Sequence, residues 1–328
     1  MSSAPTKFSY SQTSYDGTLS SIGSLSLLNT SESVKWIRAN DGHEIYTRTY
    51  RPLHRNILAT IVLVHGFGEH SDRYAPFARR CAEAGIQVYA YDLRGFGKTG
   101  RQNGRPGHTE GFQCLIDDLS FICSRAYQPD IPTIIFGHSM GAIVALHYLT
   151  SRENHLPVAG VIAQAPAIQT NSEIKPNRVT ISLGHLAAKM AKKMTVAVPI
   201  EPEMLTRDQQ IVAEFKDSSY NYEVGSLQCM SDLLKRGPML LEVCDQLRSI
   251  PILITHGDQD KITPMAGSRQ LFDRLPFNMD KELKIYVGLY HELHHEPEKD
   301  EIIGYYIEWT LKRADMACLQ RDLAGDLG

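Results

Sequence analysis

The sequence of 328 residues lacks any apolar run that approaches the roughly 18 residues of a membrane-spanning helix. It has no excess of charge of either sign, because 34 Lys and Arg residues stand against 37 Asp and Glu residues, a formal net charge of −3. We therefore expect no nucleic acid as a partner. The N-terminus also lacks a basic segment followed by an apolar core, so no secretory signal is predicted. A cytoplasmic protein, or one bound to the surface of a membrane, is the expectation.

Cysteine is scarce, and its six residues show neither paired nor metal-ligand spacing. In a chain of this length we expect free thiols in a reducing compartment. No internal repeat is visible either. The hydrophobic content of 42% is enough for a large core. Together with the length, it favours one large α/β domain that carries an insertion over two unrelated domains.

Short apolar runs alternate with helical patterns over residues 33–167 and again over residues 249–328, which also include a C-terminal tail. Residues 1–32 are rich in Ser, Thr and Gly, and we expect them to form a flexible tail. Period-2 alternation on both sides of Asn40-Asp41-Gly42 predicts a β-hairpin. Further strands are predicted at 59–64, 87–91, 133–136, 158–163, 252–255 and 283–287, with helices at 74–84, 111–127 and 302–313. The alternation predicts an α/β fold, with a mostly parallel sheet covered by helices on both faces.

The alternation stops between residues 168 and 248, where the pattern is helix-rich, with methionines, prolines and no convincing buried strand. We interpret this segment as a helical cap inserted above the strand ends, where ligands bind in open α/β sheets. Within it, residues 183–194 place apolar side chains at helical spacing, with Lys189, Lys192 and Lys193 off that stripe. Such a helix would either contact a membrane surface or pack onto the body of the protein.

The segment Gly137-His138-Ser139-Met140-Gly141 stands directly between a predicted buried strand and an apolar helical run. A Gly-x-Ser-x-Gly at such a turn is typical of a nucleophile elbow, in which a strained serine projects from the end of the sheet. The N-terminus of the following helix offers N–H groups and a positive dipole end to developing negative charge. This pattern makes Ser139 the candidate nucleophile.

A serine hydroxyl becomes an effective nucleophile when a base accepts its proton and an acid orients that base. Where a nucleophile elbow is used, the acid and then the base follow later in the chain, each after a strand. Two loops in the C-terminal third meet this requirement. They hold two candidate acids and three candidate bases, namely Asp258 and Asp260, then His291, His294 and His295. Composition alone chooses neither the acid nor the base.

An oxyanion hole needs two backbone N–H groups that converge on the reacting carbonyl oxygen. One comes from the residue after the nucleophile, which is Met140 here. The second comes from the turn after an early strand, and His65-Gly66-Phe67-Gly68 occupies that place. The N–H group of Phe67 is therefore the second candidate donor.

Five blocks of the sequence are specific in combination. They are residues 65–74 (HGFGEHSDRY), 92–97 (DLRGFG), 137–141 (GHSMG), 256–260 (HGDQD) and 284–291 (KIYVGLYH). With these blocks in this order, the chain resembles the monoacylglycerol lipases of the serine-aminopeptidase-like α/β-hydrolase group, and the resemblance covers about residues 33–313. It implies an α/β-hydrolase fold with a helical cap, and hydrolysis of a monoacylglycerol to glycerol and a fatty acid. It also implies that no metal or cofactor takes part. We expect the protein in the cytoplasm, either free or attached to a membrane or a lipid droplet.

The same resemblance implies which acid and which base act. The family's H-G-x-x-D loop places the acid at its fifth position, Asp260, and its G-x-Y-H motif ends on the base, His291. The chain departs from the animal members at Thr263, where they carry a cysteine. We therefore expect no thiol-directed regulation at that position.

The resemblance also implies a polar end of the substrate pocket. Glu69, Arg73 and His294 stand where monoacylglycerol lipases line the pocket for the glycerol head, and His138 matches a residue that the family places in the elbow. These groups would orient a diol. As an alternative, Glu69 and Arg73 form an ion pair that braces the oxyanion turn. Lysophospholipids, acyl thioesters and pathway-specific esters are alternative substrates for the same triad, and a catalytically silent binding module is an alternative of another class.

Overall fold

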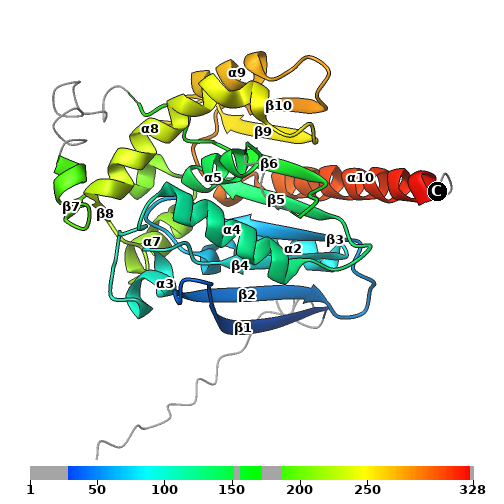
Figure 1. Cartoon of the computed structure of the whole chain (residues 1–328), viewed down its shortest axis with the longest axis horizontal. Helices are drawn as coiled ribbons and strands as arrows, with labels where there is room; N and C mark the ends of the chain where they lie inside the picture. Colours follow the sequence, from blue (N-terminus) through cyan, green and yellow to red (C-terminus); the bar gives the residue numbers. More distant parts are fainter. Residues whose placement is uncertain (1–28, 151–155, 172–186, 326–328) are drawn as a thin grey trace, which may run out of the picture.

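An eight-stranded sheet, with the order β1-β2-β4-β3-β5-β6-β9-β10, forms the centre of the molecule (Figure 1). The computed structural model describes residues 29–150, 156–171 and 187–325. The strands are β1 (Thr30–Arg38), β2 (Glu44–Pro52), β3 (Ala59–Val64), β4 (Ile86–Tyr91), β5 (Thr133–His138), β6 (Gly160–Gln164), β9 (Ile252–Gly257) and β10 (Lys281–Tyr286). β2 pairs antiparallel with β1 and with β4, and the other neighbouring strands pair in parallel. The predicted mostly parallel sheet is confirmed.

The predicted hairpin is β1 and β2, which pair from Arg38 and Glu44 outward. Its turn contains Gly42 at a φ of 88°, a left-handed conformation that glycine adopts without steric cost. β1 begins at Thr30, inside the segment that we expected to be a tail. The rest of that expectation, on residues 1–28, lies outside the described residues.

Helices cover both faces of the sheet. They are α2 (Ala75–Glu83), α3 (Gly97–Gln102), α4 (Phe112–Ala126), α5 (Met140–Tyr148), α9 (Met265–Arg274) and α10 (Lys299–Gly325). Successive residues of β3 point to opposite faces, as strand geometry requires. Val62 and Val64 belong to the apolar cluster under α4 and α5, whereas Ile61 and Leu63 belong to the cluster under α2 and α10. Burial on both faces explains why the strands read as continuous apolar runs rather than as alternating patterns.

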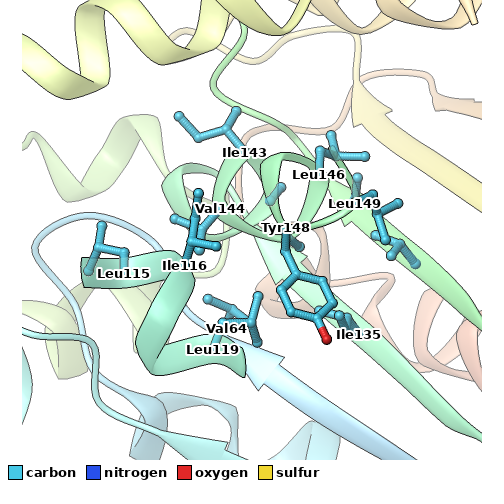
Figure 2. Packing of buried hydrophobic residues seen from close by; sticks show 14 of the residues in the cluster. Val64, Leu115, Ile116, Leu119, Ile135, Ile143, Val144, Leu146, Tyr148 and Leu149 are labelled. Atoms are coloured by element: carbon cyan, nitrogen blue, oxygen red, sulfur yellow. The ribbon is translucent and has the colours of Figure 1, made fainter. Parts of the chain in front are cut away.

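Helix α5 is the most deeply buried helix around the candidate nucleophile, and all nine of its residues are buried. Figure 2 shows Val144 of α5 beside Ile116 of α4, and Leu119 of α4 beside Val64 of β3. A helix that is apolar all round is a core helix rather than a surface helix. The packing of α5 holds the turn between β5 and α5 in a fixed position.

The predicted cap contains α7 (Gln209–Asp217) and α8 (Leu227–Val243), as expected for a helix-rich segment. It also contains two short antiparallel strands, β7 (Thr195–Ala197) and β8 (Val224–Ser226), which the sequence did not predict. Three residues are too few to establish a period-2 pattern, and β7 is exposed at both ends.

The helix predicted at 183–194 is only partly tested, because residues 172–186 lie outside the described part of the chain. Residues 187–190 are helical, and the chain then turns before β7, with the N–H of Met194 bonded to the carbonyl of Ala191 at 3.0 Å. The prediction is therefore wrong for residues 191–194. Met190, which the pattern placed on the apolar stripe, is 85% exposed.

The pattern did not predict two helices, and it predicted less than half of another. α3 and α9 were missed, and α10 continues to Gly325, well beyond the predicted end at residue 313. The later turns of α10 carry exposed Met316 and Leu319 among charged residues, so they lack the one-sided apolar pattern of a packed helix. Within the described ranges, no helix is long and apolar enough to span a membrane.

Candidate active site

Ser139 stands alone between the last residue of β5 and the first residue of α5. Its backbone is strained, with φ 52° and ψ −114°, and its N–H group donates to the carbonyl of Gln164 at 2.9 Å. The flanking glycines are required by close backbone contacts. A Cβ on Gly137 would lie 2.6 Å from the carbonyl oxygen of Gly141, and a Cβ on Gly141 would collide with the carbonyl of Val64. The predicted nucleophile elbow is therefore present in geometry.

Asp260 and His291 follow the carboxyl ends of β9 and β10, and they are joined by a hydrogen bond of 2.7 Å from Nδ1 of His291 to Oδ2 of Asp260. Asp258 is engaged elsewhere, because its Oδ1 accepts from the N–H of Gly288 at 2.7 Å. The structure thus brings together the acid and the base that the motifs selected. Because Nδ1 of His291 donates, its Nε2 is left to accept a proton.

The Asp260 carboxylate is held in its charged form. Burial by itself would raise its pKa, but the charge of His291 and hydrogen bonds from His256 and His291 bring the pKa well below the ordinary range. Its Oδ1 also accepts from two backbone N–H groups, those of Ile262 (2.8 Å) and Thr263 (2.9 Å). Burial by itself would lower the pKa of His291, but the charge of Asp260 raises it above 6.5. The pair is suited to stabilise an imidazolium.

Thr263 and His256 are partners of Asp260 whose contacts the sequence did not reveal. The hydroxyl of Thr263 donates to Oδ2 of Asp260 at 2.9 Å, and Nε2 of His256 lies 3.0 Å from the same oxygen. Thr263, where the sequence departs from the resemblance, stabilises the carboxylate directly. The motif block at 256–260 contains His256, but nothing in the spacing indicated that its ring turns back onto Asp260.

The turn that holds Phe67 lies directly against the elbow. A Cβ on Gly66 would meet Oε1 of Glu69 at 2.9 Å and Cβ of Ser139 at 3.3 Å. The N–H of Gly66 donates to the same Glu69 oxygen at 2.6 Å, and this bond closes the turn. Met140, the other predicted donor, is the first residue of α5, where backbone N–H groups have no partner within the helix.

Glu69 and Arg73 form the predicted ion pair, but a third member, Glu292, was not foreseen. Arg73 donates to Oε2 of Glu69 at 2.6 Å, and to both oxygens of Glu292 at 2.6 and 2.7 Å. The other Glu69 oxygen also accepts from the hydroxyl of Tyr74 at 2.8 Å. Nδ1 of His295 donates to Oε2 of Glu292 at 2.8 Å. Glu292 directly follows the candidate base in the sequence, yet only the fold shows that it reaches a residue far away in the chain.

This ion-pair cluster is buried and remains charged. Burial raises the pKa of Glu292 by itself, but the charge of Arg73 and a hydrogen bond from His295 hold it well below 4.5. For Glu69, burial has the same raising effect, and the charge of Arg73 again brings the pKa below 4.5. Glu69, His138 and Glu292 also offer ligand atoms within 4.8 Å of one another, as a metal site requires. Arg73 contacts both carboxylates, so the positive charge at this place comes from a side chain.

His138 of the elbow and His294 lie side by side. The ring of His138 is 4.7 Å from the ring of His291 and 5.3 Å from that of His294, between centroids. His294 stacks on Tyr74 at 4.3 Å with an interplanar angle of 13°. Both histidines also contact Gln164, a residue that no motif contained.

The block at 92–97 shapes the neighbouring turn. Asp92 accepts from the backbone N–H groups of Ser71 (2.8 Å) and Lys98 (2.6 Å), so it ties the short helix η1 (Ser71–Tyr74) to α3. Arg94 forms a two-pronged ion pair with Asp118 of α4, at 2.7 and 2.9 Å. These side chains position the loops around the site.

A small cavity of about 200 Å³ lies between Arg73 and the cap. His70 and Asp72 line it together with Glu214 and Ser218 of the cap. Its walls suit a small polar molecule better than an acyl chain, which needs apolar walls.

Comparisons with known proteins show the family and the fold of the chain. The sequence model of a family described as serine aminopeptidase, S33, matches residues 55–298. An abhydrolase domain-containing protein of Dictyostelium discoideum is 35% identical over 285 residues, and the match covers 87% of this chain but only 30% of that protein. A monoacylglycerol lipase of Mycolicibacterium smegmatis is 31% identical over 257 residues, covering 76% of this chain and 87% of that protein. The crystal structure of the Paleococcus ferrophilus monoacylglycerol lipase superposes with a TM-score of 0.73 at 25% identity, over 82% of this chain and 99% of that one.

Proposed function

Because the chain belongs to the serine aminopeptidase S33 family and has the α/β-hydrolase fold, we propose that it hydrolyses carboxylic esters with Ser139, His291 and Asp260 as catalytic triad. The resemblance drawn from the five sequence blocks is thereby confirmed at the level of the family. The main proposed substrate is a monoacylglycerol, which would yield glycerol and a fatty acid.

One observation carries this proposal. Ser139 lies at a strained elbow, at the same edge of the sheet as a buried pair of histidine and carboxylate that is joined at 2.7 Å. A histidine held by a charged carboxylate at Nδ1 presents its other nitrogen as a base. If Ser139 only shaped a turn, no buried histidine and carboxylate would be needed at the ends of β9 and β10.

The proposed mechanism proceeds through an acyl-enzyme. His291 takes the proton of the Ser139 hydroxyl through Nε2 while the serine oxygen attacks the ester carbonyl. The N–H groups of Phe67 and Met140 hold the negative oxygen, and the Asp260 carboxylate stabilises the imidazolium. His291 then gives its proton to the departing alcohol. Water, activated by the same histidine, releases the fatty acid.

The substrate class rests on the relatives and on the polar end of the site. The Mycolicibacterium and Paleococcus proteins are both named monoacylglycerol lipases. Close to the elbow, the side chains of Glu69, Arg73, His138 and His294 form a buried polar cluster, and we propose that this cluster orients the glycerol head. Since Glu69 and Arg73 are strongly paired with each other and with Glu292, they hold the cluster in place in addition to any contact with the ligand.

The test is release of fatty acid from a panel of monoacyl-, diacyl- and triacylglycerols, lysophospholipids and acyl-CoA, with Ser139→Ala as the control. We expect a strong preference for monoacylglycerol, and no turnover above background by the folded Ser139→Ala protein. Preferred turnover of a lysophospholipid or an acyl-CoA would replace the substrate class and keep the mechanism. Near-normal turnover by a folded Ser139→Ala protein would reject the mechanism.

We propose in addition that residues 168–248 act as a cap that contacts a lipid surface. In support, Met190 and Met194 are 85% and 54% exposed, and Lys189, Lys192 and Lys193 beside them are exposed as well. Exposed apolar side chains beside cationic ones favour an anionic membrane surface. Charge reversal of the three lysines should weaken binding to anionic vesicles, measured by flotation, and unchanged binding would refute this contact.

A further inference from the structure

A glutamine amide joins the two histidines next to the nucleophile, His138 and His294. Gln164 is fully buried at the end of β6. Its amide nitrogen donates to Nδ1 of His138 at 3.0 Å and to Nδ1 of His294 at 2.7 Å. Its amide oxygen accepts from the hydroxyl of Tyr306 at 3.1 Å, and Tyr306 is bonded in turn to Thr255 at 2.7 Å. This sense of the amide makes Nδ1 of both histidines an acceptor.

A donor at Nδ1 decides where a neutral imidazole carries its proton. Such a ring has one N–H and one accepting nitrogen, so an accepting Nδ1 places the proton on Nε2. Burial and then the charge of His291 lower the pKa of His138 to about 3. Burial and then the charge of His295 lower the pKa of His294 well below 6.5. Both rings are therefore neutral at physiological pH, and each carries its proton on either Nδ1 or Nε2.

We propose that Gln164 is a positioning residue that fixes His138 and His294 in the tautomer with the proton on Nε2, so that the polar end of the site offers ring N–H donors to an oxygen of the ligand. The donors recognise an oxygen that accepts, whether it belongs to a hydroxyl or to an ether. Gln164 itself does not contact the ligand in this scheme, and it acts through the two rings.

The environment of the Nε2 atom of His294 indicates that a ligand binds there. It is buried, and it has no hydrogen-bond partner among the described residues. A buried N–H without an acceptor is unfavourable, so an oxygen that reaches it adds to affinity. The stacking of His294 on Tyr74, at 4.3 Å, holds the plane of the ring and therefore the direction of that N–H.

The surroundings of His138 favour the same tautomer independently. Its Cδ2 edge, which carries Nε2, lies against Gly66, where a Cβ would be 3.2 Å from Cδ2 and 2.9 Å from Oε1 of Glu69. Glu69 and Glu292 each place one oxygen within 4.8 Å of a ring nitrogen of His138. The negative charge of Glu69 on the Cδ2 side of the ring favours a protonated Nε2.

The consequence for specificity rests on the proposed function, because it assigns the acceptor to the departing alcohol of the ester. A glycerol hydroxyl can accept from the N–H of His294, and an ether oxygen can accept equally well. A methylene group in the same place leaves the N–H unpaired. The site would then recognise an accepting oxygen of the alcohol, and the hydrogen of its hydroxyl group would not matter.

The tautomers can be observed directly by NMR of the protein labelled with ¹⁵N-histidine, since a protonated and an accepting ring nitrogen have well separated shifts. Signals are assigned with His138→Gln and His294→Gln. We expect the proton on Nε2 of both rings in the wild type, and a proton on Nδ1 of at least one ring in Gln164→Glu, whose carboxylate accepts where the amide donated. Tyr306→Phe is the control for disturbed packing, because it keeps the amide donor, and its tautomers should match the wild type. A proton on Nδ1 of either neutral ring in the wild type, or no change in Gln164→Glu, overturns the proposal.

The reading of oxygen is tested with three esters of one fatty acid, made with ethylene glycol, 2-methoxyethanol and 1-propanol. We expect the first two to have similar kcat/KM and the propyl ester to be roughly tenfold slower, which is the size of one directed hydrogen bond. If the propyl ester matches the methoxyethyl ester, the ring N–H does not reach the alcohol, and that part of the proposal is wrong. If none of the three is cleaved, the proposed function fails instead, and the NMR result is unaffected because it needs no turnover.

Discussion

Replacement of Asp260 by asparagine should invert the hydrogen-bond sense of the base. Oδ1 of Asp260 accepts from the N–H groups of Ile262 and Thr263, at 2.8 and 2.9 Å. In Asp260→Asn, the amide oxygen is retained at this position, because an amide NH₂ there would face two backbone N–H groups that cannot turn away. His256, which lies near the other oxygen, keeps the carbonyl of Thr263 as an acceptor at 2.7 Å. The NH₂ group must then occupy the place of Oδ2 and point at Nδ1 of His291, which now has to accept. The proton of His291 moves to Nε2, and the histidine can no longer take the proton of Ser139.

The magnitude follows from the loss of the base and of the carboxylate charge together. The equivalent substitution in the Ser-His-Asp triad of another fold lowers kcat about 10⁴-fold, and we expect a loss of about 10³- to 10⁴-fold here. This corresponds to about 4–5.5 kcal/mol of transition-state stabilisation, at 1.36 kcal/mol for each factor of ten. Asp258→Asn is the matched control in the same loop. An amide oxygen can accept from the N–H of Gly288 as the carboxylate does, so kcat should stay within about threefold.

The assay is the initial rate with a soluble p-nitrophenyl ester, and thermal unfolding of each variant verifies that it is folded. The pH profile adds a second readout. Activity of the wild type falls as pH decreases through the pKa of His291, which the Asp260 charge holds above 6.5. Without that charge, any residual activity should extend to lower pH. Equal losses in Asp260→Asn and Asp258→Asn, or a loss below tenfold in a folded Asp260→Asn, would refute the reasoning.

Three further predictions concern the stability of the structure around the site. In Gly141→Ala the new Cβ collides with the carbonyl of Val64, so urea unfolding should show a loss of about 1–3 kcal/mol together with reduced activity, and a variant equal to the wild type in both would contradict this. Leu119→Ala empties part of the core shown in Figure 2 and should cost about 2–5 kcal/mol in the same experiment, whereas a cost below about 1 kcal/mol would mean that the site repacks. Glu292 is charged in the folded protein, and its pKa there is well below 4.5. Its ion pair with Arg73 therefore contributes to the free energy of unfolding in full above pH 4.5, and this contribution is lost as the pH falls below 4.5. Thermal melts over an acidic pH series should show this decline, and a smaller decline is expected in Glu292→Gln.

The sequence by itself determined the frame of the molecule. Buried strands read as apolar runs because both faces of the sheet are covered, and all of the predicted strands of that sheet were found. The elbow around Ser139 was predictable because its Gly-x-Ser-x-Gly pattern stands directly between a buried strand and an apolar helix. Local patterns failed where the structure is not local. The three-residue strands of the cap carry no period, and the later turns of α10 lack an apolar face, so neither was foreseen.

Only the tertiary structure decided the contacts of the side chains at the site. Composition left Asp258 and Asp260 open, and the register of the loops after β9 and β10 brings Asp260 to His291. Gln164 and His294 are 130 positions apart, and no motif contained Gln164. A hydrogen bond between such residues depends on which strands are neighbours and on where their ends meet. The sequence therefore supplied the chemical groups, and the parallel order of the strands, which gathers their carboxyl ends at one edge, decided which of those groups meet.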